Sequence, residues 1–434
     1  MKQNKTPKTY TIISLGCPKN TVDSEVLKGG LNRAGLLSVD KTENADVIII
    51  NTCGFIKDAK EESIETIFEA VNLKSEDNGK IVIATGCLTE RYKQELTDEI
   101  QEVDAIFGID SQADIIKYLT KDRMAMPDLA TIRDLITPPY QAYLKIAEGC
   151  DNQCSFCAIP GIRGPQRSRT IEDVLREADY LQQKGVKEVV LTAQDLTRYG
   201  TDNYGELKLY DLVEELLKGA FFPWLRIMYT NPDFWNPELL ELFNRYDGLC
   251  QYIDIPVQHS SDRILKLMNR SRKSEEVKKI ISNVREKVPG IAIRTSIITG
   301  FPTETEEDFN DLLDFVEEMR FERLGVFTYS EEEDTVAAKL KDDVPAEVKE
   351  RRQEELMETQ FDIASEFAAS KIGKTIDVLV EGREDDHYRG RTQWDAPEVD
   401  CFIMVKSDRE LQPGEFCKIR VTDTINMDLI GEIK

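Results

Sequence analysis

The stretch Tyr143–Cys157, YLKIAEGCDNQCSFC, places three cysteines directly after a predicted β-strand. Cys150, Cys154 and Cys157 are separated by three and then two residues. Thiolates this close in sequence can share one metal cluster, and three of them leave one iron of a four-iron cluster open to a cofactor. A structural zinc site is the alternative, but the second pair of ligands that it usually needs is missing. The spacing therefore favours an iron–sulfur cluster with an open iron.

The same order of strand and helix continues on both sides of this motif. Six candidate strands lie between about residues 140 and 330: Tyr143–Ala147, Glu188–Thr192, Leu225–Tyr229, Tyr252–Val257, Ala292–Ile298 and Leu324–Thr328. Six βα units predict a partial barrel, short of the eight that close a full (βα)8 barrel. Active sites of such barrels lie at the carboxyl ends of the strands, and the cysteine motif follows the first one.

The N-terminal segment repeats the pattern on a smaller scale. Its apolar runs are Tyr10–Leu15, Asp46–Asn51 and Lys80–Thr85, with amphipathic stretches between them, which predicts a Rossmann-like parallel sheet. Cys17, Cys53 and Cys87 each come just after one of these runs. The carboxyl ends of parallel strands meet at one edge of the sheet, where ligands bind. A single cysteine is more often a buried apolar residue, but three at equivalent positions favour a second cluster.

The tail has a third pattern. Short alternating strands such as Thr375–Val380, Phe402–Val405 and Phe416–Val421 are separated by glycine-containing turns, which predicts a small antiparallel β-barrel. The expected fold class is thus α/β with three domains: residues 1–135, 136–368 and 371–434.

Charge and composition limit the classes of partner. Acidic residues number 81 and basic residues 56, a net charge of −25. Such a field disfavours non-specific binding to nucleic acid or anionic membranes and favours a basic partner, although from charge alone simple solubility is the preferred interpretation. No apolar run is long enough to span a membrane, and we expect a cytoplasmic protein. Nine cysteines, an odd number, then indicate metal or redox chemistry rather than disulfides.

The cysteine spacing, with Phe156 just before the last cysteine, resembles the radical S-adenosylmethionine superfamily. The resemblance implies that a reduced cluster cleaves S-adenosylmethionine to a 5′-deoxyadenosyl radical, and that the Phe156 backbone contacts the adenine. With the N-terminal cysteines and the tail, the chain resembles the methylthiotransferase family over essentially its whole length. That family implies a C-terminal TRAM barrel and two [4Fe-4S] clusters, with the auxiliary cluster on Cys17, Cys53 and Cys87 delivering the sulfur.

Two branches of this family compete, one modifying adenosine in transfer RNA and the other an aspartate of a small-subunit ribosomal protein. Several stretches resemble the second branch: SLGCPKN from Ser14 to Asn20, TPP from Thr137 to Pro139, DIPVQH from Asp254 to His259 and DAPE from Asp395 to Glu398. Residues 374–434 contain 9 basic and 14 acidic residues, a balance of −5. An acidic barrel suits a basic ribosomal protein and not transfer RNA. We therefore expect a basic small-subunit ribosomal protein as the substrate and an electron donor such as a flavodoxin or ferredoxin. We expect no stable binding to nucleic acid and no binding to a membrane.

The resemblance further implies the reaction, in which the radical removes a hydrogen from the aspartate β-carbon and the product is 3-methylthioaspartate. An iron–sulfur protein that only passes electrons is the alternative from another class. Three cysteines per cluster would leave each of its clusters with an open iron, which favours catalysis.

Several residues are weaker candidates for the cofactor pocket. Gln194 and Asp195 end the second barrel strand, and Gln258 and His259 the fourth, where they line the cofactor pocket or, with equal weight, cap a helix. Arg294 is a candidate partner of the cofactor carboxylate. Arg163, Arg167 and Arg169 follow the cysteine loop and either bind cofactor or substrate or form surface ion pairs.

Two stretches depart from the family pattern. Pro160–Gly164 replaces a more usual Ser-Met before Arg-Gly, and Thr303 stands where glycine is common. The remaining cysteines lie in apolar, strand-like stretches, and we expect them to have structural roles: Cys250, Cys401 and Cys417. Trp394 is expected to pack in the core of the tail.

Overall fold

A computed structural model describes residues 8–77, 79–121 and 131–434. The chain divides into two compact units. The first comprises residues 1–138, 142–152 and 157–181, and the second residues 139–141, 153–156 and 182–434. The α/β class is confirmed, with parallel sheets followed by a closed β-barrel.

The first unit contains a parallel sheet with the strand order β2-β1-β3-β4-β5. Its strands are β1 (Thr9–Ser14), β2 (Leu37–Ser38), β3 (Val47–Thr52), β4 (Ile81–Gly86) and β5 (Ala105–Ile106). Its helices are α1 (Pro18–Arg33), α2 (Lys57–Glu76), α3 (Cys87–Arg91), α4 (Lys93–Glu99) and α5 (Gln112–Thr120), with a 3-10 turn at Thr42–Asn44. This order is that of flavodoxin-like sheets, so the Rossmann-like prediction is confirmed.

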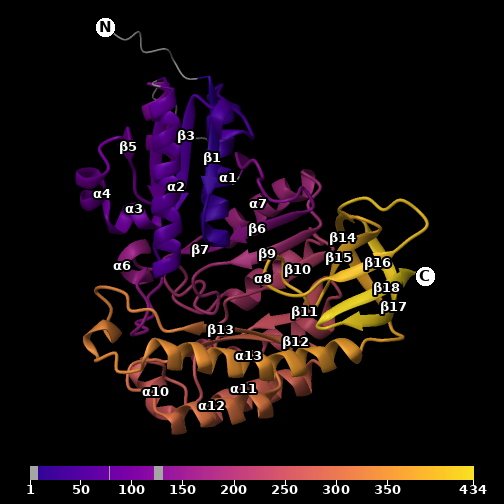
Figure 1. The fold of residues 1–434 in the computed structure, drawn as a ribbon. Helices are drawn as coiled ribbons and strands as arrows, with labels where there is room; N and C mark the ends of the chain where they lie inside the picture. Colours follow the sequence, from indigo (N-terminus) through magenta and orange to yellow (C-terminus); the bar gives the residue numbers. More distant parts are fainter. Residues whose placement is uncertain (1–7, 78, 122–130) are drawn as a thin grey trace. The chain divides into compact units, whose positions relative to one another are not determined.

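Both faces of this sheet are covered, which is why β3 is buried along its whole length. Ile48 and Ile50 pack with α2, α3 and α4 on one face, while Val47 and Ile49 pack with α1 and α5 on the other. Figure 1 shows α2 lying lengthwise along the strands. Because β1, β3 and β4 are parallel neighbours, the loops that follow them all begin at the same edge of the sheet.

The rest of the first unit carries the start of the cysteine motif. It includes most of β6 (Gln141–Lys145), then β7 (Ala147–Glu148), α6 (Ile159–Arg163), β8 (Arg167–Ser168) and most of α7 (Ile171–Gln183). The antiparallel pair β7–β8 brings the residues before Cys150 beside those after Gly164.

The second unit contains the parallel sheet of the predicted partial barrel, with the strand order β13-β12-β11-β10-β9. The strand β6, whose first residue Gln141 belongs to this unit, comes next to β9 in the order of the sheet. The strands are β9 (Glu188–Thr192), β10 (Trp224–Ile227), β11 (Leu249–Asp254), β12 (Ala292–Thr299) and β13 (Arg323–Thr328). The helices are α8 (Leu209–Lys218), α9 (Leu239–Arg245), α10 (Asp262–Leu267), α11 (Ser274–Lys287), α12 (Glu306–Met319) and α13 (Ala346–Ala369), with 3-10 turns at Pro232–Phe234 and Ala337–Lys339. Successive strands are joined through helices, as parallel neighbours require.

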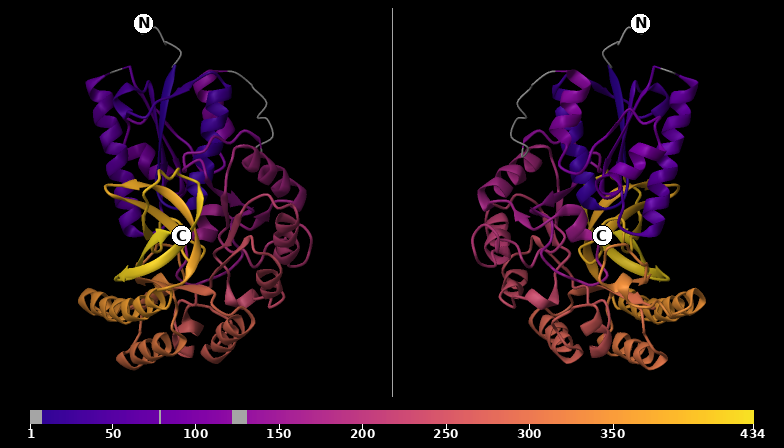
Figure 2. Two further views of the ribbon diagram at one scale, coloured as in Figure 1. Left: turned by 90° about the vertical axis from the view of Figure 1, so that its right-hand side faces the viewer. Right: turned by 90° about the vertical axis from the view of Figure 1, so that its left-hand side faces the viewer.

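The tail folds as the closed barrel β14-β15-β16-β18-β17, drawn in yellow tones in Figures 1 and 2. Its strands are β14 (Thr375–Glu384), β15 (His387–Thr392), β16 (Ile403–Lys406), β17 (Phe416–Ile425) and β18 (Asp428–Ile433). Trp394 packs against its apolar core, as expected. The pairing of β16 with β18 is parallel and the other pairings are antiparallel, so the prediction of an antiparallel barrel is correct except at this closing pair.

A buried ionic cluster fixes the barrel to the parallel sheet within the second unit. Arg391 of β15 and Arg226 of β10 both bind the Glu188 carboxylate on β9, and Arg226 Nη1 also donates to the carbonyl of Gln393 at 2.8 Å. A further pair joins Arg323 to Asp395. Because these side chains are fully or nearly fully buried, each charge depends on its partner.

Some predicted strand ends differ from the observed ones. β11 ends at Asp254 and not at Val257, because Pro256 has no N–H to continue a ladder. β10 ends at Ile227, and Tyr229 has a left-handed backbone with φ +58°. The predicted domain boundaries at residues 135 and 368 stay predictions. Within the described residues, no helix is both long and apolar enough to cross a membrane.

The start of α12 gives a testable dependence of stability on pH. Thr305 and Asp308 form a capping box, and Asp308 also accepts hydrogen bonds from Ser261 Oγ and the Arg263 guanidinium. Although burial raises it, these hydrogen bonds hold the pKa of Asp308 well below its usual range. A lowered carboxyl pKa stabilises the fold above the unfolded-chain pKa of about 4, and this stabilisation is lost as the pH falls.

Asp308→Asn is expected to destabilise the protein at pH 6.5 by on the order of 1 kcal/mol, the size of a typical cap. The deficit should begin to shrink at pH 3.5, because the unfolded chain then takes up a proton that the folded carboxylate, with its lowered pKa, does not. Urea unfolding of both proteins at the two pH values measures this difference. Asp311→Asn, at an exposed position of the same helix, is the control. A deficit that stays constant with pH would contradict the assignment.

Candidate functional site

Cys17, Cys53 and Cys87 lie at the carboxyl edge of the first sheet. Cys17 precedes α1, while Cys53 and Cys87 directly follow β3 and β4, which are neighbours in the sheet. Cys53 and Cys87 are buried and Cys17 is partly buried. The structure thus brings the three predicted ligands to one place, although 35 and then 33 residues separate successive cysteines in the chain.

Glycines beside the cysteines let the loops approach each other. Gly16 has φ +84°, and a Cβ on it would lie 2.7 Å from both Cβ and Sγ of Cys53. Gly86 has φ +105°, and a Cβ there would lie 2.4 Å from the side-chain oxygen of Asn51. These positions have no room for a larger residue, so the loops around the thiols are built for close contact.

The surroundings of these thiols are polar and cationic. Burial raises the pKa of Cys17, but the charges of Lys19 and Arg163 and nearby backbone N–H groups outweigh it, and the net pKa is lowered. Burial raises the pKa of Cys87 to about 12, against the opposing charge of Arg163. Arg163 Nε donates to Cys87 Sγ at 3.3 Å. Fixed positive charge and N–H donors around thiol sulfurs fit thiolates that carry a cluster.

Among the residues that the structure describes, no group of three His, Cys, Asp or Glu side chains is placed to hold one metal ion. In a four-iron cluster each cysteine binds a different iron, so the thiolates do not need to converge on a point, and three of them leave one iron open. The residues present fit such a cluster.

Asn20 is a functional candidate that the sequence did not single out beyond its place in SLGCPKN. It is fully buried, and its amide nitrogen donates to the carbonyls of Leu15 and Thr52, both at 2.9 Å. Its side-chain oxygen accepts from Arg163 Nη2. Asn20 therefore holds the ends of β1 and β3 together beside the thiols.

The central cysteines lie on a loop whose parts are fixed locally. The Cys150 N–H donates to the Gly164 carbonyl at 3.1 Å. Arg270 Nη1 lies 3.8 Å from Cys154 Sγ, and its Nη2 donates to Asn231 Oδ1 at 2.8 Å. Phe156 packs with a buried cluster that includes Met268 and Phe301.

The candidate residues Gln194 and Asp195 follow the end of β9, and Gln258 and His259 lie beyond the end of β11, and several of them have structural partners. Asp195 accepts from the backbone N–H of Thr197 at 2.8 Å and from Asn231 Nδ2 at 3.3 Å. Gln194 is partly buried just before it. Gln258 has φ +70°. Its backbone N–H donates to the carbonyl of Ser296 and its carbonyl accepts from the N–H of Ile298, so it pairs with β12 on both sides of Ile297. Both strand ends therefore carry polar groups on a fixed backbone.

His259 is held by a network that fixes its tautomer. Its Nδ1 accepts from the N–H groups of Ser260 and Ser261, both at 2.9 Å, so Nε2 carries the hydrogen and donates to Glu304 at 3.3 Å. Glu304 in turn pairs with Arg352 at 2.7 Å. This ring is buried in a structural network.

The predicted arginines have carboxylate partners. Arg294 on β12 pairs with Asp254 at 3.2 Å and lies 3.7 Å from Asp400 of the tail. Arg167 forms an exposed pair with Asp110. Arg169 pairs with Asp173 and Glu177. Arg167 therefore forms a surface ion pair, one of the two alternatives expected for these arginines, while Arg163 is buried beside the thiols.

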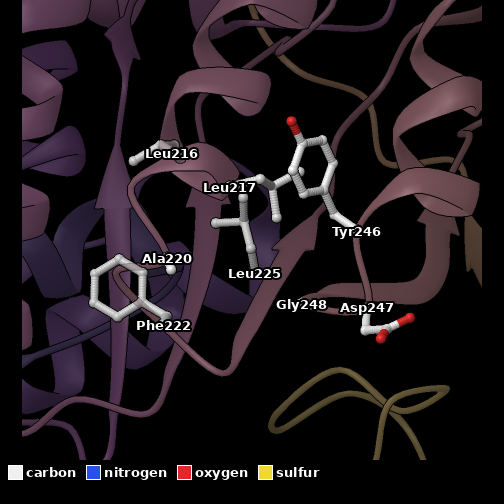
Figure 3. A pocket seen from close by; sticks show the side chains of 8 residues that line it. All are labelled: Leu216, Leu217, Ala220, Phe222, Leu225, Tyr246, Asp247 and Gly248. Carbon is white, nitrogen blue, oxygen red and sulfur yellow. The ribbon is translucent and has the colours of Figure 1, made fainter.

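A small cavity of about 120 Å³ lies elsewhere in the second unit (Figure 3). Its lining is mostly apolar: Leu216, Leu217, Ala220, Phe222, Leu225, Tyr246, Asp247 and Gly248. Leu225 and Gly248 lie at the start of β10 and just before β11, at the opposite end of the strands from the candidate residues. The cavity is therefore separate from the candidate site.

Comparisons with known proteins agree with this organisation. Residues 144–316 match the Radical SAM superfamily, residues 9–108 match Uncharacterized protein family UPF0004, and residues 372–433 match the TRAM domain. A protein of Clostridioides difficile named Ribosomal protein uS12 methylthiotransferase RimO is 47% identical, over 97% of each chain. A Thermoanaerobacter protein of the same name is also 47% identical, over 98% of this chain and 100% of its own.

The chain belongs to the RimO family. The resemblance to radical S-adenosylmethionine methylthiotransferases is thus confirmed, and membership of the superfamily implies an iron–sulfur cluster and S-adenosylmethionine. Among solved structures, a radical S-adenosylmethionine methyltransferase, TsrM of Kitasatospora setae, has a TM-score of 0.54. It covers 73% of this chain and 72% of its own at 13% identity, so the likeness concerns the fold.

Proposed function

We propose that this RimO family member adds a methylthio group to the β-carbon of an aspartate in ribosomal protein uS12, giving 3-methylthioaspartate. The observation that carries the proposal is the match over nearly the full length to relatives named for that activity. The acidic tail supports it, because a balance of −5 suits a basic protein better than transfer RNA.

We assign two [4Fe-4S] clusters to the six cysteines. Cys150, Cys154 and Cys157 hold the radical cluster, and Cys17, Cys53 and Cys87 hold the auxiliary cluster. The glycine-lined contacts and the cationic surroundings of the second set support this assignment. When bound, the clusters and S-adenosylmethionine supply the 5′-deoxyadenosyl radical, the sulfur and the methyl group.

Radical chemistry suits this substrate because a β C–H bond next to a carboxylate is not acidic enough for removal by a side-chain base. The chain's own task is to hold groups in place and to keep water out. Phe156, Gln194, Asp195, Gln258 and Arg294 are proposed to line the cofactor pocket. The hydrogen bonds of Asp195 and Gln258 support the residues after β9 and β11, since they fix the backbone of the loops that follow these strands.

The remaining partners are proposals of the same kind. A cytoplasmic electron donor, a flavodoxin or ferredoxin, supplies electrons to the radical cluster. Neither stable binding to nucleic acid nor binding to a membrane is part of the proposed function, in keeping with the net charge of −25.

The test is a reaction with two substrates. The protein is reconstituted anaerobically, reduced, and given S-adenosylmethionine with either ribosomal protein uS12 or transfer RNA. Mass spectrometry should find one methylthio group on an aspartate of the protein substrate. Modification of transfer RNA alone would overturn the substrate in favour of the adenosine branch. Intact substrates without 5′-deoxyadenosine would favour a protein that only passes electrons.

The auxiliary site makes a separate prediction. Gly16→Ala is expected to prevent cluster binding there, because the new Cβ would lie 2.7 Å from Cys53 Sγ. Gly35→Ala is the matched control, with a similar φ of +89° and no neighbour within 4 Å of the new Cβ. Both variants bear backbone strain of about 1 kcal/mol. Iron content is measured with Cys150, Cys154 and Cys157 replaced by alanine, and normal iron in Gly16→Ala would contradict the assignment.

A further inference from the structure

Arg163 is placed to act on a proposed ligand of the auxiliary cluster. It is the last residue of α6, its side chain is 2% exposed, and its Nε donates to Cys87 Sγ at 3.3 Å. Its Nη2 donates to the side-chain oxygen of Asn20, which joins the loops that carry Cys17 and Cys53. The guanidinium therefore reaches both the sulfur and the residue that organises the loops.

Two carboxylates hold this guanidinium in place. Nη1 donates to Glu148 Oε1 at 2.8 Å and to Asp23 Oδ2 at 3.3 Å. Lys145 binds the same two carboxylates through Nζ. The four groups sum to zero charge, so the removal of Arg163 alone would leave a net negative charge in a buried place.

The next residue along the chain contacts the other cysteine set. The Gly164 carbonyl accepts from the Cys150 N–H at 3.1 Å, and Gly164 has φ +70°. Two adjacent residues, Arg163 and Gly164, thus contact a proposed ligand of each cluster. The loop after the cysteine motif is for this reason tied to the N-terminal thiols.

Hydrogen bonds to cluster sulfurs and nearby positive charge both favour the reduced, more negative state of an iron–sulfur cluster. We propose that Arg163 is a positioning residue that sets the reduction potential of the auxiliary cluster through Cys87. The inference rests on the proposed function, since it needs a cluster on Cys17, Cys53 and Cys87.

The test uses the full chain with Cys150, Cys154 and Cys157 replaced by alanine, so that only the auxiliary cluster gives a signal. Iron per chain is measured first, and then the midpoint potential by a redox titration followed by electron paramagnetic resonance. Arg163→Met is expected to bind the cluster and to shift its potential to more negative values. Arg163→Lys keeps the charge but loses the Nε–H donor, so its shift should be smaller. Arg176→Met removes an exposed arginine that pairs with Asp173 and should leave the potential unchanged.

The outcomes distinguish a failure of the auxiliary cluster site from a failure of the role of Arg163. No cluster in the parent protein would overturn the auxiliary site and this inference with it. A cluster with the same potential in parent and Arg163→Met would overturn the role of Arg163 alone, as would an equal shift in Arg176→Met. If Arg163→Met binds no iron, Arg163→Lys decides: a more negative potential supports the role, and an unchanged potential overturns it.

Discussion

Cys154→Ala is expected to reduce both 5′-deoxyadenosine formation and methylthio transfer to the level of a reaction without enzyme. Cys154 is the central thiol of the three in the motif, and a four-iron cluster with only two thiolates loses the ligand set that leaves one iron for the cofactor. The auxiliary site should still bind iron, because Cys17, Cys53 and Cys87 lie on other loops of the chain.

The measurement pairs product analysis with iron content. Cys401→Ala is the control, since Cys401 is a partly buried cysteine of the tail outside both proposed ligand sets. It should retain wild-type product and iron. Wild-type turnover by Cys154→Ala would contradict the radical mechanism proposed for this chain.

The second large effect concerns stability. Glu188→Gln is expected to lower the free energy of unfolding by about 3–5 kcal/mol, because it removes the carboxylate that the buried guanidinium groups of Arg226 and Arg391 share, and only Arg391 keeps a second one, that of Glu381. Burial alone would raise the pKa of Glu188, but Arg391 and then Arg226 outweigh it, so the group is ionised at neutral pH. The loss should uncouple the tail barrel from the parallel sheet, since Arg391 belongs to β15.

Urea unfolding followed by circular dichroism measures this loss. Glu241→Gln, which breaks an exposed pair with Arg245, is the control and should have little effect. An unchanged midpoint for Glu188→Gln would show that the ionic cluster does not hold the barrel.

The sequence predicted the order of elements well because the signals were local. Runs rich in β-branched residues marked β3 and β12, and Pro345 marked the start of α13. The ends of β10 and β11 were less predictable, because backbone geometry at Tyr229 and Pro256 decided them. The pairing of Glu188 with both Arg226 and Arg391 could not be predicted either, since these arginines are 38 and 203 positions away in the chain.

For the candidate site, cysteines could be recognised from spacing and position, and Arg163 was a candidate, whereas the contacts that polar side chains make with the cysteines could not be predicted. Arg270 reaches Cys154 from 116 residues away, and Arg163 reaches Cys87 from 76. A sequence pattern carries no sign of such pairs, because arginine is more often a surface residue. The roles proposed for the cofactor-pocket residues stay predictions.

Thr303 illustrates a departure that the structure explains. Thr303 departs from the expected family pattern, and the backbone there has φ +71°. Glycine adopts this conformation freely, while a β-branched residue is strained in it. Arg263 compensates in part, since its guanidinium donates to the Thr303 side chain at 3.0 Å and to its carbonyl at 2.7 Å.

The central claim is that a hydrogen leaves the β-carbon of an aspartate in the protein substrate. The most direct measurement supplies ribosomal protein uS12 with β-deuterated aspartate and analyses the 5′-deoxyadenosine formed by mass spectrometry. We expect the 5′-deoxyadenosine to carry deuterium in proportion to the methylthio-aspartate formed. Methylthio-aspartate formed together with 5′-deoxyadenosine that is free of deuterium would contradict it.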